Sequence, residues 1–325
     1  MLVVPHDTTL AADTVTVVIL NWNGWRNTVA CVAALLLQDY PALEIVVVDN
    51  GSTDGSESYV RAAFPQITVL QSGSNRGYAG GNNVGLRYAL ERESAYICLL
   101  NNDVSVPSTT VGSLVKVLET SPRLAAVGPT MYFEDGIHTW FAGSAIDRRS
   151  GKTQHRHSVP TLSPQQAYLP VPFLPGACFL VRADVVRTVG FLPEDYFLYY
   201  EDVDWSLAIR RAGWELGWVP SLSIIHLSEQ STRHHGATIP YYYTRNFYLF
   251  LRRNPEVAHS IPVARRMHVV SSAYRVARAL LRGNVVAPSA VAKGIADGRT
   301  GVVGQGITHY RLSPGSRILS RRRRR

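Results

Sequence analysis

Two apolar, β-branched runs in this chain each stop abruptly at an aspartate. Residues 44–49 read EIVVVD, and residues 96–103 read YICLLNND. A buried strand that ends in a carboxylate places the acid at the carboxyl edge of a sheet, where open α/β folds bind ligands. Asp49 and Asp103 therefore predict one polar crevice built from two loops. The alternative, that an aspartate only caps the helix that follows it, stays open for either one alone.

Strand-like and helix-like segments alternate along the chain at the spacing of βαβ units. This alternation predicts an α/β fold with a mostly parallel sheet, flanking helices and right-handed crossovers. Residues 132–170 show no such pattern, and we expect them to form a loop or ribbon over the sheet. The predicted strands are residues 15–20, 44–49, 67–71, 96–100, 125–128 and 221–226; the predicted helices are residues 28–37, 56–63, 87–92, 111–118 and 183–189.

Charge divides the chain into unlike parts. Residues 1–239 carry 16 Lys and Arg against 22 Asp and Glu, whereas residues 240–325 carry 17 against 2. We therefore predict a flexible leader at 1–13, a catalytic or binding domain at 14–239, and an aromatic and basic extension at 240–325 with residues 321–325 disordered.

The cysteines and the hydropathy bear on where the protein works. Cys31, Cys98 and Cys178 stand singly in apolar contexts, without the spacing of a zinc site or disulfide frame. The chain shows neither an eighteen-residue apolar run nor the pattern of a signal peptide. We expect a cytoplasmic protein.

Three acids in four residues, Glu201, Asp202 and Asp204, open a segment with helical spacing. Acids favour a helix N-terminus because of the helix dipole, and that explanation stays open. Aromatic residues just before them favour a sugar or base pocket in which one acid serves as a catalytic base.

His226 ends an apolar run, as Asp49 and Asp103 do. A site formed by one Asp and one His would suit Mn²⁺ or Mg²⁺ bound to a diphosphate, although a lone His is more often structural.

A glycine-rich loop at 77–83 could offer backbone N–H groups to phosphate. It matches neither a P-loop nor a dinucleotide fingerprint.

Over residues 14–254 the chain resembles the family 2 inverting glycosyltransferases, which have the GT-A fold. It is most similar to their rhamnosyltransferase and galactofuranosyltransferase-like branch. The resemblance divides the main domain into a nucleotide-binding half at about 14–130 and an acceptor half at about 131–239. It rests on residues 17–24, VVDNGSTDG at 47–55, NRGYAGGNN at 75–83, LNND at 100–103, PGA at 175–177, YEDVD at 200–204, and His226.

The resemblance implies roles for residues in both halves. Asp202 would be the general base, and Asp103 and His226 would bind Mn²⁺ or Mg²⁺. Glu201 and Asp204 would shape the acceptor side and orient Asp202, with Gly176 and Trp205 beside the acceptor. The residues implied in nucleotide-sugar binding are Asn21, Asp49, Asp54, Asn75, Gly77, Asn82, Asn101 and Asn102.

The function implied is transfer of a sugar, with dTDP-L-rhamnose the favoured donor, to a hydroxyl of a glycan or polyprenyl-linked acceptor. Asn101 stands where the family's D-x-D motif has its first acid, which puts the strength of metal binding in doubt. Two alternatives stay open: a catalytically degenerate scaffold at the membrane, and a sugar-nucleotide nucleotidyltransferase.

Residues 263–281 form a basic amphipathic pattern. Apolar residues recur at three- and four-residue intervals, from Val263 through Val270 and Tyr274 to Leu281, with arginines mostly between them. This pattern favours the surface of an anionic membrane, and hence a peripheral protein at the inner face of the plasma membrane. A helix packed on the main domain is the alternative, and nucleic-acid binding is not expected.

Overall fold

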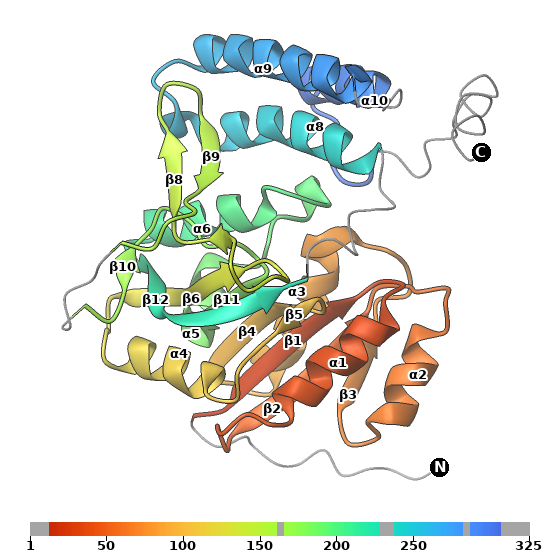
Figure 1. Ribbon diagram of the computed structural model, residues 1–325, viewed down its shortest axis with the longest axis vertical. Helices are drawn as coiled ribbons and strands as arrows, with labels where there is room; N and C mark the ends of the chain where they lie inside the picture. Colours follow the sequence, from red (N-terminus) through yellow and green to blue (C-terminus); the bar gives the residue numbers. More distant parts are fainter. Residues whose placement is uncertain (1–12, 161–165, 228–236, 282–286, 307–325) are drawn as a thin grey trace.

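A computed structural model describes residues 13–160, 166–227, 237–281 and 287–306 (Figure 1). The predictions for the leader, apart from Asp13, and for residues 321–325 lie outside these ranges. No helix within them is both long enough and apolar enough to cross a bilayer.

A twisted mixed sheet forms the centre of the molecule, in the order β10-β12-β6-β11-β4-β1-β2-β3. β1 pairs in parallel with β2 and β4, β2 with β3, and β6 with β12, while β11 runs antiparallel between β4 and β6. The predicted α/β class with a mostly parallel sheet is thus confirmed. The strands are β1 Val15–Asn21, β2 Leu43–Asp49, β3 Thr68–Gln71, β4 Tyr96–Asn101, β6 Leu124–Tyr132, β10 Leu169–Pro170, β11 Cys178–Arg182 and β12 Glu215–His226.

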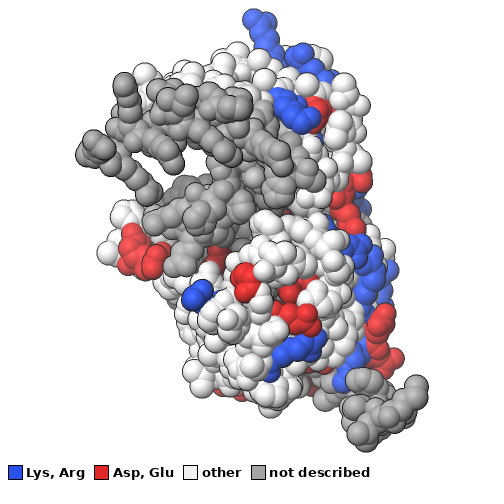
Figure 2. Space-filling view, turned by 90° about the vertical axis from the view of Figure 1, so that its right-hand side faces the viewer, with Lys and Arg blue, Asp and Glu red and all other residues white. Residues whose placement is uncertain are grey.

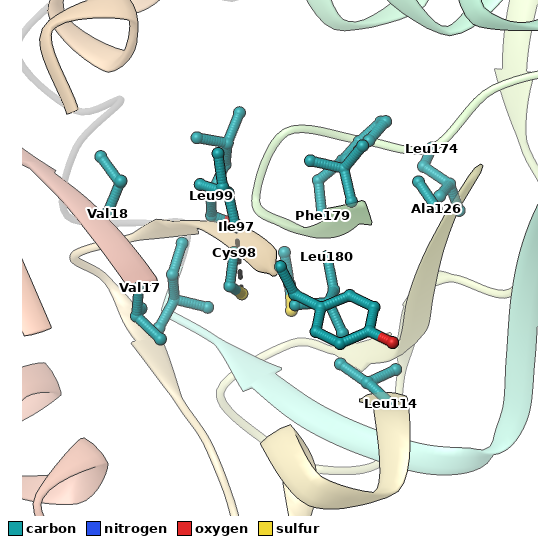
Figure 3. Packing of buried hydrophobic residues seen from close by; sticks show 14 of the residues in the cluster. Val17, Val18, Ile97, Cys98, Leu99, Leu114, Ala126, Leu174, Phe179 and Leu180 are labelled. Atoms are coloured by element: carbon teal, nitrogen blue, oxygen red, sulfur yellow. Dashed lines mark hydrogen bonds between the residues drawn. The ribbon is translucent and has the colours of Figure 1, made fainter. Parts of the chain in front are cut away.

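Apolar side chains from neighbouring strands fill the core, which the α/β layering buries (Figure 3). Val17 of β1, Ile97 of β4 and Leu180 of β11 are each fully buried. The three cysteines are buried and carry no disulfide, as predicted.

Helices cover the sheet close to where the sequence predicted them. They are α1 Trp25–Leu35, α2 Ser56–Ala63, α3 Gly77–Glu91, α4 Thr110–Glu119, α5 Ala183–Val189 and α6 Glu201–Arg211. The glycine-rich loop expected at 77–83 is wrong, because these residues are the first turns of α3. A Cβ at Gly81 would come within 2.4 Å of Leu20, and one at Gly85 within 2.2 Å of Val18. These glycines therefore let α3 lie close against β1.

The described part of residues 132–170 contains the predicted ribbon: β8 Ser144–Asp147 pairs with β9 Lys152–His155 as a hairpin, and β7 Thr139–Phe141 pairs with β6. Earlier in the chain, the short strand β5 Val104–Ser105 pairs with β12. The hairpin rises from the sheet toward the C-terminal helices (Figure 1). There Arg148 donates to the Glu256 carbonyl at 3.1 Å.

Three helices, α8 Thr238–Arg253, α9 Ile261–Leu281 and α10 Ala287–Thr300, lie at the end of the molecule opposite α1 and α2 (Figure 1). Phe247, Phe250 and Leu251 of α8 share a second hydrophobic cluster with Tyr196 and Tyr200. The domain boundary at 239/240 stays a prediction; α8 begins at Thr238 and so spans that position, and it packs against the segment that begins α6.

Candidate active site

Strand register aligns the ends of the central strands. Asn21 of β1 is paired with Asp49 of β2, and Leu20 with Asn101 of β4. β4 continues into Asp103, whose carbonyl accepts a 2.8 Å hydrogen bond from the N–H of Leu227, the residue after β12. The acids that end separate strands therefore gather at one edge of the sheet, where parallel α/β sheets hold their ligands.

At this edge, Asp49 is buried and oriented by its neighbours. It accepts the Ser52 N–H at 3.1 Å, the Ser52 hydroxyl, and the Gln71 amide at 2.9 Å. The Asn21 amide donates to Ser52 Oγ at 3.1 Å. Asp54 instead accepts the N–H of Ser56 at 3.0 Å, just before the N-cap residue Gly55 of α2, and so stabilises the turn that leads into this helix.

The start of α3 is held by side-chain amides. Asn75 Oδ1 accepts the Gly77 N–H at 2.9 Å and the Asn50 amide at 3.2 Å, while Asn50 also donates to the Gly77 carbonyl at 3.0 Å. Asn82 is buried and donates to the Tyr78 carbonyl at 3.0 Å, so it braces this turn from within. Sequence reasoning missed Asn50, although it follows Asp49 in the 47–55 motif.

Asn102 ties the loop after β4 to the first helix. Its amide donates to Thr28 Oγ1 at 3.0 Å, and the Thr28 hydroxyl donates to Asn21 Oδ1 at 2.7 Å. A Cβ at Gly24 would lie 3.0 Å from the Asn102 amide. The loops after β1 and β4 are therefore locked together.

Asp103 and His226 meet at the same edge. Asp103 Oδ1 lies 3.3 Å from His226 Nε2, and both side chains are almost wholly buried. The Asn101 amide lies 3.5 Å from that nitrogen, and the Trp140 ring packs on the imidazole at 4.6 Å between centroids. Trp140, on β7, is a further residue that sequence reasoning missed, because it lies in the region expected to be irregular.

This pair fits a divalent metal. A carboxylate oxygen and an imidazole nitrogen that face each other are a donor set suited to Mn²⁺, which takes both ligand types. No group of three or more His, Cys, Asp or Glu with metal-site geometry occurs among the described residues. The protein side chains would therefore supply two ligands and leave the remaining positions to diphosphate oxygens and water.

Asp202 lies at the start of α6 and is held by backbone donors. It accepts the Gly176 N–H at 3.0 Å and the Val203 N–H at 2.8 Å. Burial raises the pKa of Asp202 above its usual value, against the lowering effect of these N–H groups. Glu201 beside it is buried, and burial and then the charge of Asp202 raise its pKa well above the usual value. A carboxyl with a raised pKa is suited to accepting a proton.

Two neighbouring residues implied in the acceptor side are placed elsewhere. Asp204 accepts hydrogen bonds at 2.6 Å from both Arg253 and Asn254 of the α8 end, so it anchors that helix. Trp205 is 2% exposed and donates to the Gly190 carbonyl at 2.8 Å. It therefore supports α6 from the core, because its ring is buried and its N–H is bound within the protein.

The turn that precedes Glu201 has an unusual backbone. Phe197, Tyr199 and Tyr200 adopt φ angles of 64°, 69° and 77°, which are costly for side chains of this size. The Asn246 amide donates to the carbonyls of Leu198 and Tyr199 at 2.7 and 2.8 Å, and also to that of Tyr196 at 3.0 Å. Fully buried Arg245 adds a 2.6 Å bond to the Tyr196 carbonyl. Arg245 and Asn246 lie within the aromatic segment of α8. The sequence showed only that this segment is rich in aromatic and basic residues, so the role of the pair was missed.

The start of α3 contacts both the turn before α6 and the segment before β11. The Tyr78 N–H donates to the Phe197 carbonyl at 2.7 Å, and the Tyr78 hydroxyl donates to the Gly176 carbonyl at 2.6 Å. A Cβ at Gly176 would meet that hydroxyl at 2.4 Å, and a Cβ at Gly77 would meet the Phe197 carbonyl at 2.2 Å. Both glycines are thus required by contacts within the protein.

Comparison with known proteins agrees with this geometry. Residues 16–190 match the model of the family described as glycosyl transferase family 2. The N-acetylglucosaminyl-diphospho-decaprenol L-rhamnosyltransferase of Mycobacterium tuberculosis is 28% identical over 265 residues, which cover 74% of this chain and 84% of that protein. The dTDP-rhamnosyl transferase RfbF of Shigella flexneri is 24% identical, over 65% and 71% of the two chains.

Solved structures share the fold at low sequence identity. A mannosyltransferase from Pyrobaculum calidifontis, in complex with GDP-Man and Mn²⁺, aligns with a TM-score of 0.55 at 19% identity over 96% of this chain and 81% of that one. GalNAc-T7 with UDP, GalNAc and Mn²⁺ aligns with a TM-score of 0.54 at 17% identity, over 79% and 55%. These likenesses confirm the predicted GT-A architecture.

Proposed function

Because the chain belongs to glycosyl transferase family 2, we propose that it transfers a sugar from a nucleotide-diphosphate sugar to an acceptor hydroxyl with inversion at the anomeric carbon. The observation that carries this proposal is the arrangement at the sheet edge. A partly buried carboxylate, Asp202, is fixed by two backbone N–H groups on the acceptor side, and the Asp103–His226 pair lies at the strand ends.

The proposed reaction is an in-line displacement. An acceptor oxygen attacks the anomeric carbon, the bond from that carbon to the diphosphate oxygen breaks, and the acceptor proton passes to the Asp202 carboxylate. Asp103 and His226 would hold a divalent metal, which when bound supplies Lewis-acid neutralisation of the departing diphosphate. Asn101 adds no charge to the site, so Asp103 is the single carboxylate of the triplet 101–103.

We further propose dTDP-L-rhamnose as the donor and a lipid-linked sugar as the acceptor. The support is the similarity to two rhamnosyltransferases, one of which is named for a diphospho-decaprenol acceptor. The experiment is thermal shift with a panel of nucleotide sugars, with and without Mn²⁺ or Mg²⁺. A metal-dependent rise with dTDP-rhamnose is expected; no rise with any donor would favour the degenerate-scaffold reading.

Asp202→Asn tests the base directly. We expect kcat to fall by roughly two to four orders of magnitude, the usual contribution of a general base, while donor affinity measured by calorimetry stays near wild type. Asp184→Asn is the matched control, because Asp184 also lies in the first turn of a helix, α5, and accepts the N–H of the next residue at 2.8 Å. Full activity in Asp202→Asn would overturn the assignment.

A second proposal concerns the membrane. Three large apolar residues of α9 are exposed: Val270, Tyr274 and Leu281 are 65%, 69% and 90% exposed. Arg266 and Arg278 lie on either side of this stripe, and Figure 2 shows Lys and Arg at the end of the molecule where α9 and α10 lie. An exposed apolar stripe flanked by arginines is complementary to an anionic bilayer surface.

Point variants test this face in the full-length protein. Tyr274→Asp and Val270→Asp should reduce co-sedimentation with vesicles rich in phosphatidylglycerol, because they place a negative charge on the stripe. Leu37→Asp, which changes a residue 73% exposed at the far end of α1, should bind as wild type does. Equal binding by all variants would contradict the proposal.

A further inference from the structure

Two cationic side chains converge where the β8–β9 hairpin meets α9. Lys152 of β9 donates to Ser271 Oγ at 2.9 Å, and Arg275 donates to the buried Ser272 Oγ at 2.9 Å. Neither has a carboxylate within 4.0 Å among the described residues, so serine hydroxyls hold them instead. Desolvation and then the charge of Arg275 lower the pKa of Lys152, and Asp147 offsets this only weakly.

A buried histidine completes the cluster. His268 is 3% exposed and stacks on Phe247 with ring centroids 4.1 Å apart. Its Nε2 has no hydrogen-bond partner among the described residues. Burial, Arg275 and Lys152 lower the pKa of His268 to about 3, so the ring is neutral and its neighbours are positive. Positive charge without a counter-charge, next to a buried unpartnered nitrogen, points to an anionic ligand.

The cluster is close to the proposed base. The charge of Arg275 acts on both Tyr200 and Tyr243, and Asp202 acts on the same two phenols. The Tyr200 and Tyr243 rings contact each other with centroids 5.8 Å apart. Tyr200, two residues before Asp202, also contacts Phe247 with ring centroids 6.4 Å apart, and Phe247 stacks on His268, so a chain of rings joins the start of α6 to the cluster.

We propose that Lys152 and Arg275 form a subsite for the phosphate attached to the acceptor sugar, as in a glycosyl phosphate or diphosphate. This inference rests on the proposed transfer to a lipid-linked sugar and adds the group through which the acceptor is recognised. Arg and Lys bind phosphate oxygens by charge-assisted hydrogen bonds, and the serine contacts hold both side chains in place. The position beside the membrane-facing helix α9 suits a phosphate that joins the sugar to a lipid.

The test compares two acceptors in Lys152→Gln, Arg275→Gln and the double variant. One acceptor is a lipid N-acetylglucosaminyl diphosphate and the other an alkyl N-acetylglucosaminide without phosphate. We expect KM for the diphosphate acceptor to rise roughly tenfold or more per residue, the usual worth of a hydrogen bond to a charged group. KM for the phosphate-free acceptor, and kcat for both, should not change. Lys116→Gln and Arg187→Gln, which change exposed residues of α4 and α5, are the matched controls.

A binding arm separates failure of the subsite from failure of the proposed function. Calorimetry with soluble N-acetylglucosaminyl diphosphate, in EDTA and without donor, should show binding to wild type that the double variant loses. Absence of that binding overturns the subsite even where transfer is normal. If the double variant loses only vesicle co-sedimentation, the cations bind a phospholipid headgroup and the proposal is overturned. If binding is seen without transfer to either acceptor, the subsite stands and the proposed function fails.

Discussion

Glu201 and Asp202 are adjacent carboxyl groups at the start of α6, and their surroundings differ. Asp202 accepts two backbone N–H groups, whereas Glu201 Oε2 is buried without a hydrogen-bond partner among the described residues. A buried carboxylate that lacks donors is costly, so the protonated form of Glu201 is favoured. The pair therefore combines one oriented base with one carboxyl that resists ionisation.

Stability should depend on pH through Glu201. Its folded-state pKa lies above the unfolded value of 4.5, so the unfolded chain binds fewer protons and stability falls as pH rises from 4.5 toward the folded pKa. Glu201→Gln removes this titration. We expect the variant to have a higher Tm than wild type at pH 7 and a difference that disappears near pH 4.5. A Tm difference that does not change with pH would contradict the shift.

Activity should fall at the acid side earlier than for an exposed aspartate. Since burial raises the pKa of Asp202 above 3.8, the base form is lost as pH falls through that raised value. We expect the acid limb of the kcat profile to lie above pH 3.8, measured in the range where thermal denaturation shows the protein to be folded. An acid limb at or below 3.8 would mean that another group serves as the base.

At the scale of elements, the contact between α3 and the turn before α6 depends on Gly77. Its φ is +71°, and a Cβ would meet the Phe197 carbonyl at 2.2 Å. Gly73 has a similar φ of +79° with nothing within 4 Å of a Cβ, so it serves as a control for backbone strain alone. Gly77→Ala should lower Tm and kcat much more than Gly73→Ala. Equal losses would show that the contact is unimportant.

The clamp formed by Asn246 of α8, whose amide donates to the carbonyls of Tyr196, Leu198 and Tyr199, should control the position of Asp202. Asn246→Ala leaves the carbonyls of Leu198 and Tyr199 without their donor, which costs about 1–3 kcal/mol of unfolding free energy. We expect kcat to fall while donor affinity, measured by calorimetry, stays near wild type. Arg252→Ala is the control, because Arg252 on the same helix contacts Gly298 of α10. A kcat equal to that of the control would show that the turn keeps its shape without Asn246.

The sequence predicted elements better than side-chain directions. The ends of the strands could be predicted from the sequence, because an apolar run followed by an acid marks the carboxyl end of a buried strand. The observed register then brings Asp49 and Asp103 to one edge of the sheet. Asp204 and Trp205 follow Asp202 by two and three positions. Asp204 binds α8 and Trp205 is buried in the core, and these directions depend on packing between distant segments. The clamp of Asn246 joins residues 47 positions apart along the chain, and no local pattern marks it.

For the whole molecule, the uneven charge of the chain predicts salt-dependent membrane binding. Excess positive charge lies after residue 239, and the Debye length falls from about 10 Å at 0.1 M salt to about 3 Å at 1 M. Co-sedimentation with anionic vesicles should therefore decrease over this range, with residual binding from the apolar stripe of α9. Binding that salt does not affect would assign the interaction to the apolar residues alone.

The position of β12 also has a consequence for synthesis. β6 ends at Tyr132, but its parallel partner is complete only at His226. At bacterial and eukaryotic elongation rates this delay lasts roughly 5–20 s, during which one edge of an almost wholly buried strand has no partner. Exposed strand edges invite pairing with other chains. The nascent polypeptide should therefore depend on ribosome-associated chaperones until His226 emerges, and slower translation of residues 133–226 should increase aggregation.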